Sequence, residues 1–113
     1  KLIEKVAEET GPYLKKRWQE FEDHPLVGEA RTVGLLGALE LVEDKAKRKH
    51  FPKNRKVGEI CRDICIEKNI VMRAIKDIMV VSPPLIITKE QIDEMHDLVK
   101  SCLDLTAKKL GVI

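Results

Sequence analysis

A single arginine stands inside one of the apolar segments of the sequence, where a charged side chain is unusual. Arg73 lies within the segment 70–74, next to a polar turn that contains Lys76 and Asp77. The planar guanidinium of arginine can donate parallel hydrogen bonds to both oxygens of a carboxylate, and such a charge-assisted contact is worth about 1.5–3 kcal/mol. An arginine on the open face of a sheet can also be idle in solvent. The sequence therefore leaves two interpretations of Arg73 open, carboxylate binding and simple exposure.

The cysteines and histidines form no pattern that is typical of catalysis or metal binding. Cys61 and Cys65 are one helical turn apart, which is a poor geometry for a disulfide, and Cys102 falls on another apolar stripe. We therefore expect three small buried thiols in a reducing compartment, and hence a cytoplasmic protein. The histidines are scattered and lack CxxC-like or HxxxH-like spacing: His24, His50 and His96. We expect no metal site, no cofactor-binding residue and no catalytic residue within the chain.

Composition and charge argue against a nucleic-acid or membrane partner. The 21 Lys and Arg residues are balanced by 19 Asp and Glu residues, and the charges alternate in sign along the chain. One Trp, one Tyr and two Phe leave little for base stacking. Gly34-Leu35-Leu36-Gly37 has the GxxG spacing of KH domains, but its two leucines lie in an apolar run and favour a strand bend. No apolar run approaches the roughly 20 residues that cross a bilayer.

The elements that would position Arg73 follow from the hydrophobic periodicity and the turn residues. The sequence predicts a helix over 1–23 that Gly11-Pro12 interrupts, and then two strands or one long bent strand over 27–42. An exposed charged loop over 43–54, a helix over 55–68 that Asn69 ends, and a hairpin of 70–74 with 78–81 follow. Thr88 and Gln91 form a capping box before a last helix, with an apolar face that carries Ile92, Met95, Val99, Cys102 and Thr106. This order predicts a single α+β domain over 1–113, with a small, mainly antiparallel sheet covered by helices on one face.

Two sequence motifs resemble the C-terminal small domain of class III aminotransferases. The first is the segment 24–41, His24-Pro25-Leu26-Val27-Gly28-Glu29-Ala30-Arg31 followed by Val33-Gly34-Leu35-Leu36-Gly37-Ala38-Leu39-Glu40-Leu41. The second and more specific motif is Val71-Met72-Arg73-Ala74, then Asp77, then Ser82-Pro83-Pro84-Leu85-Ile86-Ile87-Thr88 with Ile92-Asp93-Glu94. The resemblance covers nearly the whole chain and is to the amine:pyruvate, or ω-transaminase, branch.

The resemblance implies an activity for a longer protein. In this family a lysine of the large domain holds pyridoxal 5′-phosphate, and an amino group passes from an amine or ω-amino acid to a keto acid such as pyruvate. Arg73 matches the family's mobile arginine, which pairs with the substrate carboxylate and swings aside for an apolar group. Met72, Ala74 and Ile75 would then shape the rim of the cleft. The family is also homodimeric.

The chain departs from the family pattern in ways that qualify these expectations. Thr32 and Lys76 stand where the family usually has glycine. Glycine at position 76 would allow a positive φ that lysine adopts only with strain, so we expect Lys76 to reshape the turn. Lys76 would also add a second positive charge near a bound acid. The large domain's cofactor motifs are missing, and the chain begins without Met inside an amphipathic pattern, so we expect an inactive fragment. The alternative is a free-standing α+β module that binds a small molecule or a protein.

Overall fold

A four-stranded antiparallel sheet forms the centre of the computed structural model, which describes residues 2–112. Its strands are β1 (Val27–Val33), β2 (Leu36–Leu41), β3 (Arg73–Ile75) and β4 (Ile78–Val81), in the order β1-β2-β4-β3. Two sequence-local hairpins are therefore joined by the β2–β4 ladder, and the short strand β3 lies at one edge. The predicted α+β fold with an antiparallel sheet is confirmed.

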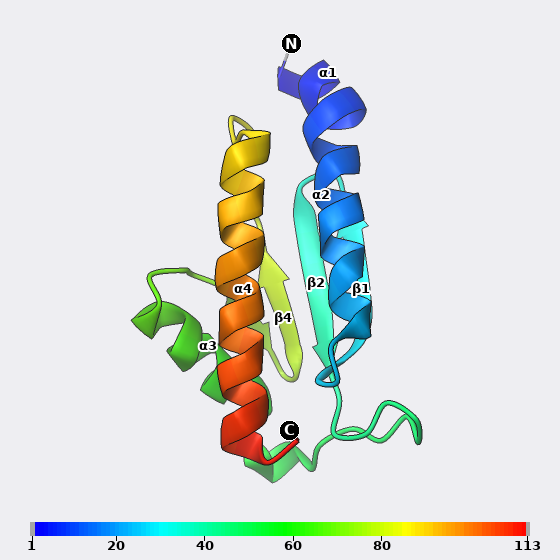
Figure 1. The fold of residues 1–113 in the computed structure, drawn as a ribbon, viewed down its shortest axis with the longest axis vertical. Helices are drawn as coiled ribbons and strands as arrows, with labels where there is room; N and C mark the ends of the chain where they lie inside the picture. Colours follow the sequence, from blue (N-terminus) through cyan, green and yellow to red (C-terminus); the bar gives the residue numbers. More distant parts are fainter. Residues whose placement is uncertain (1, 113) are drawn as a thin grey trace.

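Helices cover one face of this sheet. α2 (Gly11–Gln19) and α4 (Lys89–Leu110) run side by side across it, and α3 (Val57–Glu67) lies against α4 and the second hairpin (Figure 1). Residues Ala30, Leu39 and Met79 are opposite one another on β1, β2 and β4 and are buried beneath these helices. Because side chains alternate across a strand, the next cross-strand row points to the other face. That face carries exposed apolar side chains such as Val33 and Leu36.

The N-terminal helical segment contains a π-helical turn where the sequence predicts an interruption. α1 (Leu2–Lys5) continues into the π turn η1 (Val6–Thr10), then into α2 and the 3-10 turn η2 (Glu20–Asp23). Pro12 has no amide hydrogen to donate and sits in the first turn of α2, where the intrahelical bond is not needed. The widened turn before it leads the backbone into the new helix without a break. The predicted helix is thus one continuous segment with a local defect.

The remaining elements end where their turn residues predict. Gly34, with φ 57°, closes the β1–β2 hairpin, and Asn69, with φ 65°, follows the end of α3 in the left-handed conformation. At the start of α4, the Thr88 side chain accepts from the Gln91 amide while the Gln91 side chain accepts from the Thr88 amide. The capping box is confirmed, and the five predicted apolar-face residues of α4 are all buried.

The second hairpin differs in one respect from its predicted form. Strand β3 begins at Arg73, so residues 70–72 lie outside it and Arg73 is the first residue of the strand instead of its middle. The two-residue turn Lys76–Asp77 leaves Ile75 in the strand, paired with Ile78. Lys76 has φ 56°, as its position in a tight turn requires. The apolar run had suggested a longer strand because apolar content does not distinguish a paired residue from a buried loop residue.

Candidate functional site

Arg73 lies on the uncovered face of the sheet. It is opposite Val80 of β4, which is opposite Ala38 of β2, which is opposite Arg31 of β1. Side chains in one cross-strand row share a face, so the two arginines stand on the same surface at opposite edges of the sheet. Both are exposed.

The two arginines differ in their electrostatic surroundings. Arg31 Nη1 lies 3.4 Å from Glu29 Oε2 and 3.7 Å from Glu40 Oε2, so two carboxylates offset its charge. Arg73 takes part in none of the ion pairs or side-chain hydrogen bonds found among residues 2–112. Its guanidinium is therefore free to receive an external carboxylate, whereas that of Arg31 is engaged within the fold.

Arg73 lines a cavity of about 740 Å³ at the β3 edge. Its lining contains no acidic residue and is mainly apolar: Arg62, Ile70, Val71, Met72, Arg73, Ala74, Val80, Val81, Ser82, Pro83, Pro84 and Met95. Arg62 is the second cation of this lining, but its Nη2 lies 3.2 Å from Asp63 Oδ1 and 4.0 Å from Glu59 Oε1. The arrangement suits a ligand with one carboxylate and an apolar body.

The structure also places the neighbours of Arg73 that the sequence singles out. Met72 and Ala74 line the cavity, whereas Ile75 is not among its lining residues. Lys76 does not line this cavity but a neighbouring one of about 430 Å³, which shares Arg62 and Ala74 with it. The extra charge of Lys76 therefore lies beside the Arg73 cavity and not in its lining. Sequence reasoning missed Arg62, which follows Cys61 on a helix and carries no local signal that would mark it.

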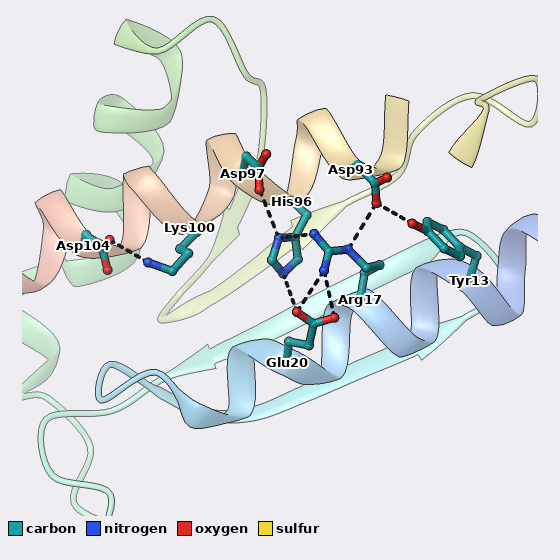
Figure 2. A network of polar contacts seen from close by, with 8 residues as sticks. All are labelled: Tyr13, Arg17, Glu20, Asp93, His96, Asp97, Lys100 and Asp104. Atoms are coloured by element: carbon teal, nitrogen blue, oxygen red, sulfur yellow. Dashed lines mark hydrogen bonds and ion pairs between the residues drawn. The ribbon is translucent and has the colours of Figure 1, made fainter. Parts of the chain in front are cut away.

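A polar network joins α2 to α4 away from the Arg73 cavity (Figure 2). Asp93 Oδ1 accepts from Tyr13 Oη at 2.6 Å and lies 3.2 Å from Arg17 Nε. The Arg17 Nη1 atom donates to both carboxylate oxygens of Glu20 at 3.0 Å. The hydrogen bond to Asp93 raises the pKa of Tyr13, because it favours the protonated phenol. Asp93 is therefore a partner between the two helices.

His96 lies within this network and is buried. Its ring stacks on Phe21 with centroids 4.5 Å apart, and Arg17 Nη2 lies 3.2 Å from its Nδ1. Burial, and then the positive charge of Arg17, hold the pKa of His96 below its ordinary value. The neutral ring can accept from Arg17 at Nδ1. His96 therefore packs between the helices as a buried group, and with His24 and Asp104 it also lines a cavity of about 420 Å³.

The three cysteines lie buried on the facing helices α3 and α4, as predicted, and none is in a disulfide. Hydrogen bonding with Cys102 and Cys61, together with burial, raises the pKa of the Cys65 thiol far above its usual range. A buried, protonated thiol is a poor nucleophile. Among residues 2–112, no group of three or more His, Cys, Asp and Glu side chains is placed to hold a metal ion. No helix in the same stretch is both long and apolar enough to cross a bilayer.

The described residues do not fit pyridoxal 5′-phosphate, the cofactor that the resemblance implies. A lysine that forms a Schiff base in such enzymes is desolvated beside the cofactor. No lysine of residues 2–112 is buried, and none lines the cavity at Arg73. We therefore assign no cofactor contact to this chain.

Known proteins with similar sequences are aminotransferases. The putrescine–pyruvate aminotransferase of Pseudomonas aeruginosa is 55% identical over 107 residues, which are 95% of this chain and 23% of that protein. The diaminobutyrate–2-oxoglutarate transaminase of Halomonas elongata is 42% identical over 92 residues, which are 79% of this chain and 20% of that protein. No protein-family model matches the chain. The chain thus spans about a quarter or less of the length of these relatives.

Solved transaminase structures contain the same fold. A transaminase from ancestral reconstruction superposes with a TM-score of 0.87 and 44% identity, over 92% of this chain and 23% of that one. The ω-transferase of Vibrio fluvialis gives a TM-score of 0.87 and 32% identity, over 96% of this chain and 26% of that one. The alignment with the Pseudomonas relative and the two superpositions each cover more than nine tenths of this chain. The chain therefore belongs to the class III, pyridoxal-phosphate-dependent aminotransferases, as a segment about a quarter as long as these relatives.

Proposed function

We propose that this chain is the C-terminal small domain of an amine:pyruvate-type aminotransferase, and that Arg73 selects substrates by receiving their carboxylate. The observation that carries this proposal is that Arg73, which has no ion pair or side-chain hydrogen bond among residues 2–112, lines a mainly apolar cavity without acids. A free guanidinium can pair with both oxygens of an amino acid or keto acid. The cavity's apolar lining would contact the rest of the substrate.

The position of Arg73 also suits a side chain that serves two kinds of substrate. It stands at the first residue of a three-residue edge strand and is exposed, and no hydrogen bond or ion pair with residues 2–112 holds its side chain in one rotamer. The guanidinium can therefore pair with an acid and move into solvent when a plain amine presents an apolar group. The substrates of this protein would be an amine or amino acid together with a keto acid such as pyruvate, as the name of the Pseudomonas relative suggests.

In this proposal the cofactor is bound elsewhere in the longer protein. Pyridoxal phosphate supplies the electron sink of such reactions, and the described residues offer no buried lysine for it. The residues of this chain would bind the acid group of the substrate and orient it by the Arg73 pairing. The chain alone would bind acids weakly and transfer no amino group.

We also propose a homodimeric parent protein in the cytoplasm. Exposed apolar side chains on the uncovered sheet face and near the cavity need cover in the assembled protein, among them Val33, Val71 and Ile86. The three unpaired cysteines favour a reducing compartment. Each of these statements rests on the aminotransferase assignment.

The test of the Arg73 proposal is a comparison of substrates in the full-length protein. Arg73→Ala should lower kcat/KM by about 10- to 150-fold for amino acid donors, which corresponds to the loss of a charge-assisted contact. Activity on a plain amine should stay within about twofold. Arg31→Ala removes an exposed arginine from the same sheet face, where two carboxylates already engage it, and should change neither. Equal losses on both substrate types would contradict the proposal.

A further inference from the structure

The hairpin that carries Arg73 forms one edge of the sheet. Strand β3 has three residues, pairs with β4 alone and has no strand on its other side. The hairpin is anchored in the sheet through β4, which pairs with β2, but β3 is held on the sheet only by its three-residue ladder with β4. The position of Arg73 therefore also depends on what packs against β3, and α3 contacts both strands of the hairpin.

The contact between α3 and the hairpin is made by two backbones. A Cβ atom at Gly58 would lie 1.9 Å from the carbonyl oxygen of Lys76, 3.0 Å from the carbonyl carbon of Lys76 and 3.4 Å from Ala74 Cβ. The turn carbonyl thus rests directly over the Cα of Gly58, where a hydrogen replaces the side chain. Contacts of this kind between Cα–H and a carbonyl are weakly attractive. Gly58 is buried, in the first turn of α3.

Any larger residue at position 58 would move the hairpin. Carbon and oxygen atoms that are not bonded do not approach within 3.0 Å, so a methyl group would push the turn outward by about 1 Å or more. The obstacle is backbone, which cannot rotate out of the way as a flexible side chain can. Arg73 lies three residues before Lys76, at the far end of the three-residue strand β3 that leads into the turn, and would move with it.

We infer that Gly58 is a positioning residue, which sets the place of the Arg73 guanidinium by letting the β3–β4 turn rest on the first turn of α3. This inference rests on the proposed role of Arg73. It goes beyond that role, because it makes α3 a determinant of acid recognition although Gly58 lines no part of the Arg73 cavity. A misplacement of about 1 Å can cost as much as 100-fold in rate where two groups must be aligned.

The test uses the full-length protein with four variants and two substrate classes. Gly58→Ala should raise KM for an amino acid donor at least tenfold, with a smaller change in kcat, and should leave KM for a plain amine within about twofold. The dissociation constant of pentanoate, a carboxylate without an amine, should rise by a similar factor in calorimetry. Gly28→Ala is the matched control, because its Cβ would meet the Val42 side chain at 2.7 Å, away from this hairpin. It should leave the ratio of the two KM values unchanged.

Two further variants distinguish an error in the proposed function of Arg73 from an error in the inferred role of Gly58. In Gly58→Ala combined with Lys76→Gly, the turn can adopt other conformations and rotate its carbonyl away from α3, so much of the acid affinity should return. This double variant also supplies the test if Gly58→Ala alone does not fold. Arg73→Ala reports on the proposed function itself. If Arg73→Ala spares neither substrate class, that function is wrong; if it discriminates while Gly58→Ala and the double variant change both KM values alike or neither, only the role of Gly58 is overturned.

Discussion

The difference between Arg73 and Arg31 shows how residue type alone underdetermines chemistry. Both are exposed arginines in the same cross-strand row, yet only Arg31 has carboxylates within 4 Å. Glu29 lies two residues before Arg31 on the same face of β1, and the antiparallel register with β2 brings Glu40 near as well. The cavity lining of Arg73 contains no acid that could do the same. The candidate binding group is therefore the arginine that has no carboxylate partner within the fold.

The buried His96 makes the stability of the folded chain depend on pH. Its pKa is lowered in the folded chain, so the unfolded chain takes up the proton first as the pH falls. His96 therefore contributes stability above its ordinary pKa near 6.5, and this contribution is lost as the pH falls below that value. We expect the free energy of unfolding to decrease between pH 7.5 and pH 5, and His96→Gln to reduce this slope by at most about 1.4 kcal/mol per pH unit. Urea denaturation at several pH values measures both slopes; identical slopes would contradict the assignment.

Only some residues of the candidate site could be predicted from the sequence. The apolar run around Arg73 made that residue stand out, and the turn at Lys76 was recognisable from its neighbours. The role of Asp93 was not, because its partners Tyr13 and Arg17 come from a helix some 80 positions away. Nor could sequence alone separate Arg73 from Arg31, since the decisive difference is which carboxylates the sheet register brings near.

At the scale of elements, α4 depends on its first turn. Thr88 and Gln91 satisfy each other's backbone amides reciprocally. Thr88→Ala removes one acceptor and should lower the free energy of unfolding by about 1 kcal/mol. Ser101→Ala lies within the same helix, away from its ends, and should change stability by less than about 0.5 kcal/mol. Thermal or urea unfolding of the two variants provides the comparison, and equal effects would argue against the cap.

Elements with strong local signals were predictable, and those set by tertiary contacts were less so. The capping box, the left-handed Asn69 and the glycine turn at Gly34 each follow from the side chains present. The start of β3 at Arg73 does not, because pairing with Val80 decides which residues of the apolar segment become strand. The same holds for Gly58. A glycine in a helix is normally unfavourable, and only the Lys76 carbonyl above it explains its place.

At the scale of the whole molecule, one sheet face is covered and the other is open. Val33 is 79% exposed and Leu36 is 49% exposed on that open face. Burial of such side chains is favourable at roughly 25 cal/mol per Å², so the isolated chain should self-associate as its concentration rises. Sedimentation velocity over a range of concentrations should show this. Leu36→Glu should reduce the association, and a monomeric distribution at every concentration would contradict the prediction.

The strand order β1-β2-β4-β3 has a consequence for how the chain folds. Each hairpin closes over a two-residue turn, whereas the β2–β4 ladder must bring together strands separated by residues 42–77. Closing a loop of that length costs on the order of 3 kcal/mol of chain entropy before the ladder forms. The docking of one hairpin on the other, with α3 in the intervening segment, therefore carries a larger entropy cost than the closing of either hairpin turn. The Arg73 hairpin would acquire its final place only at that step.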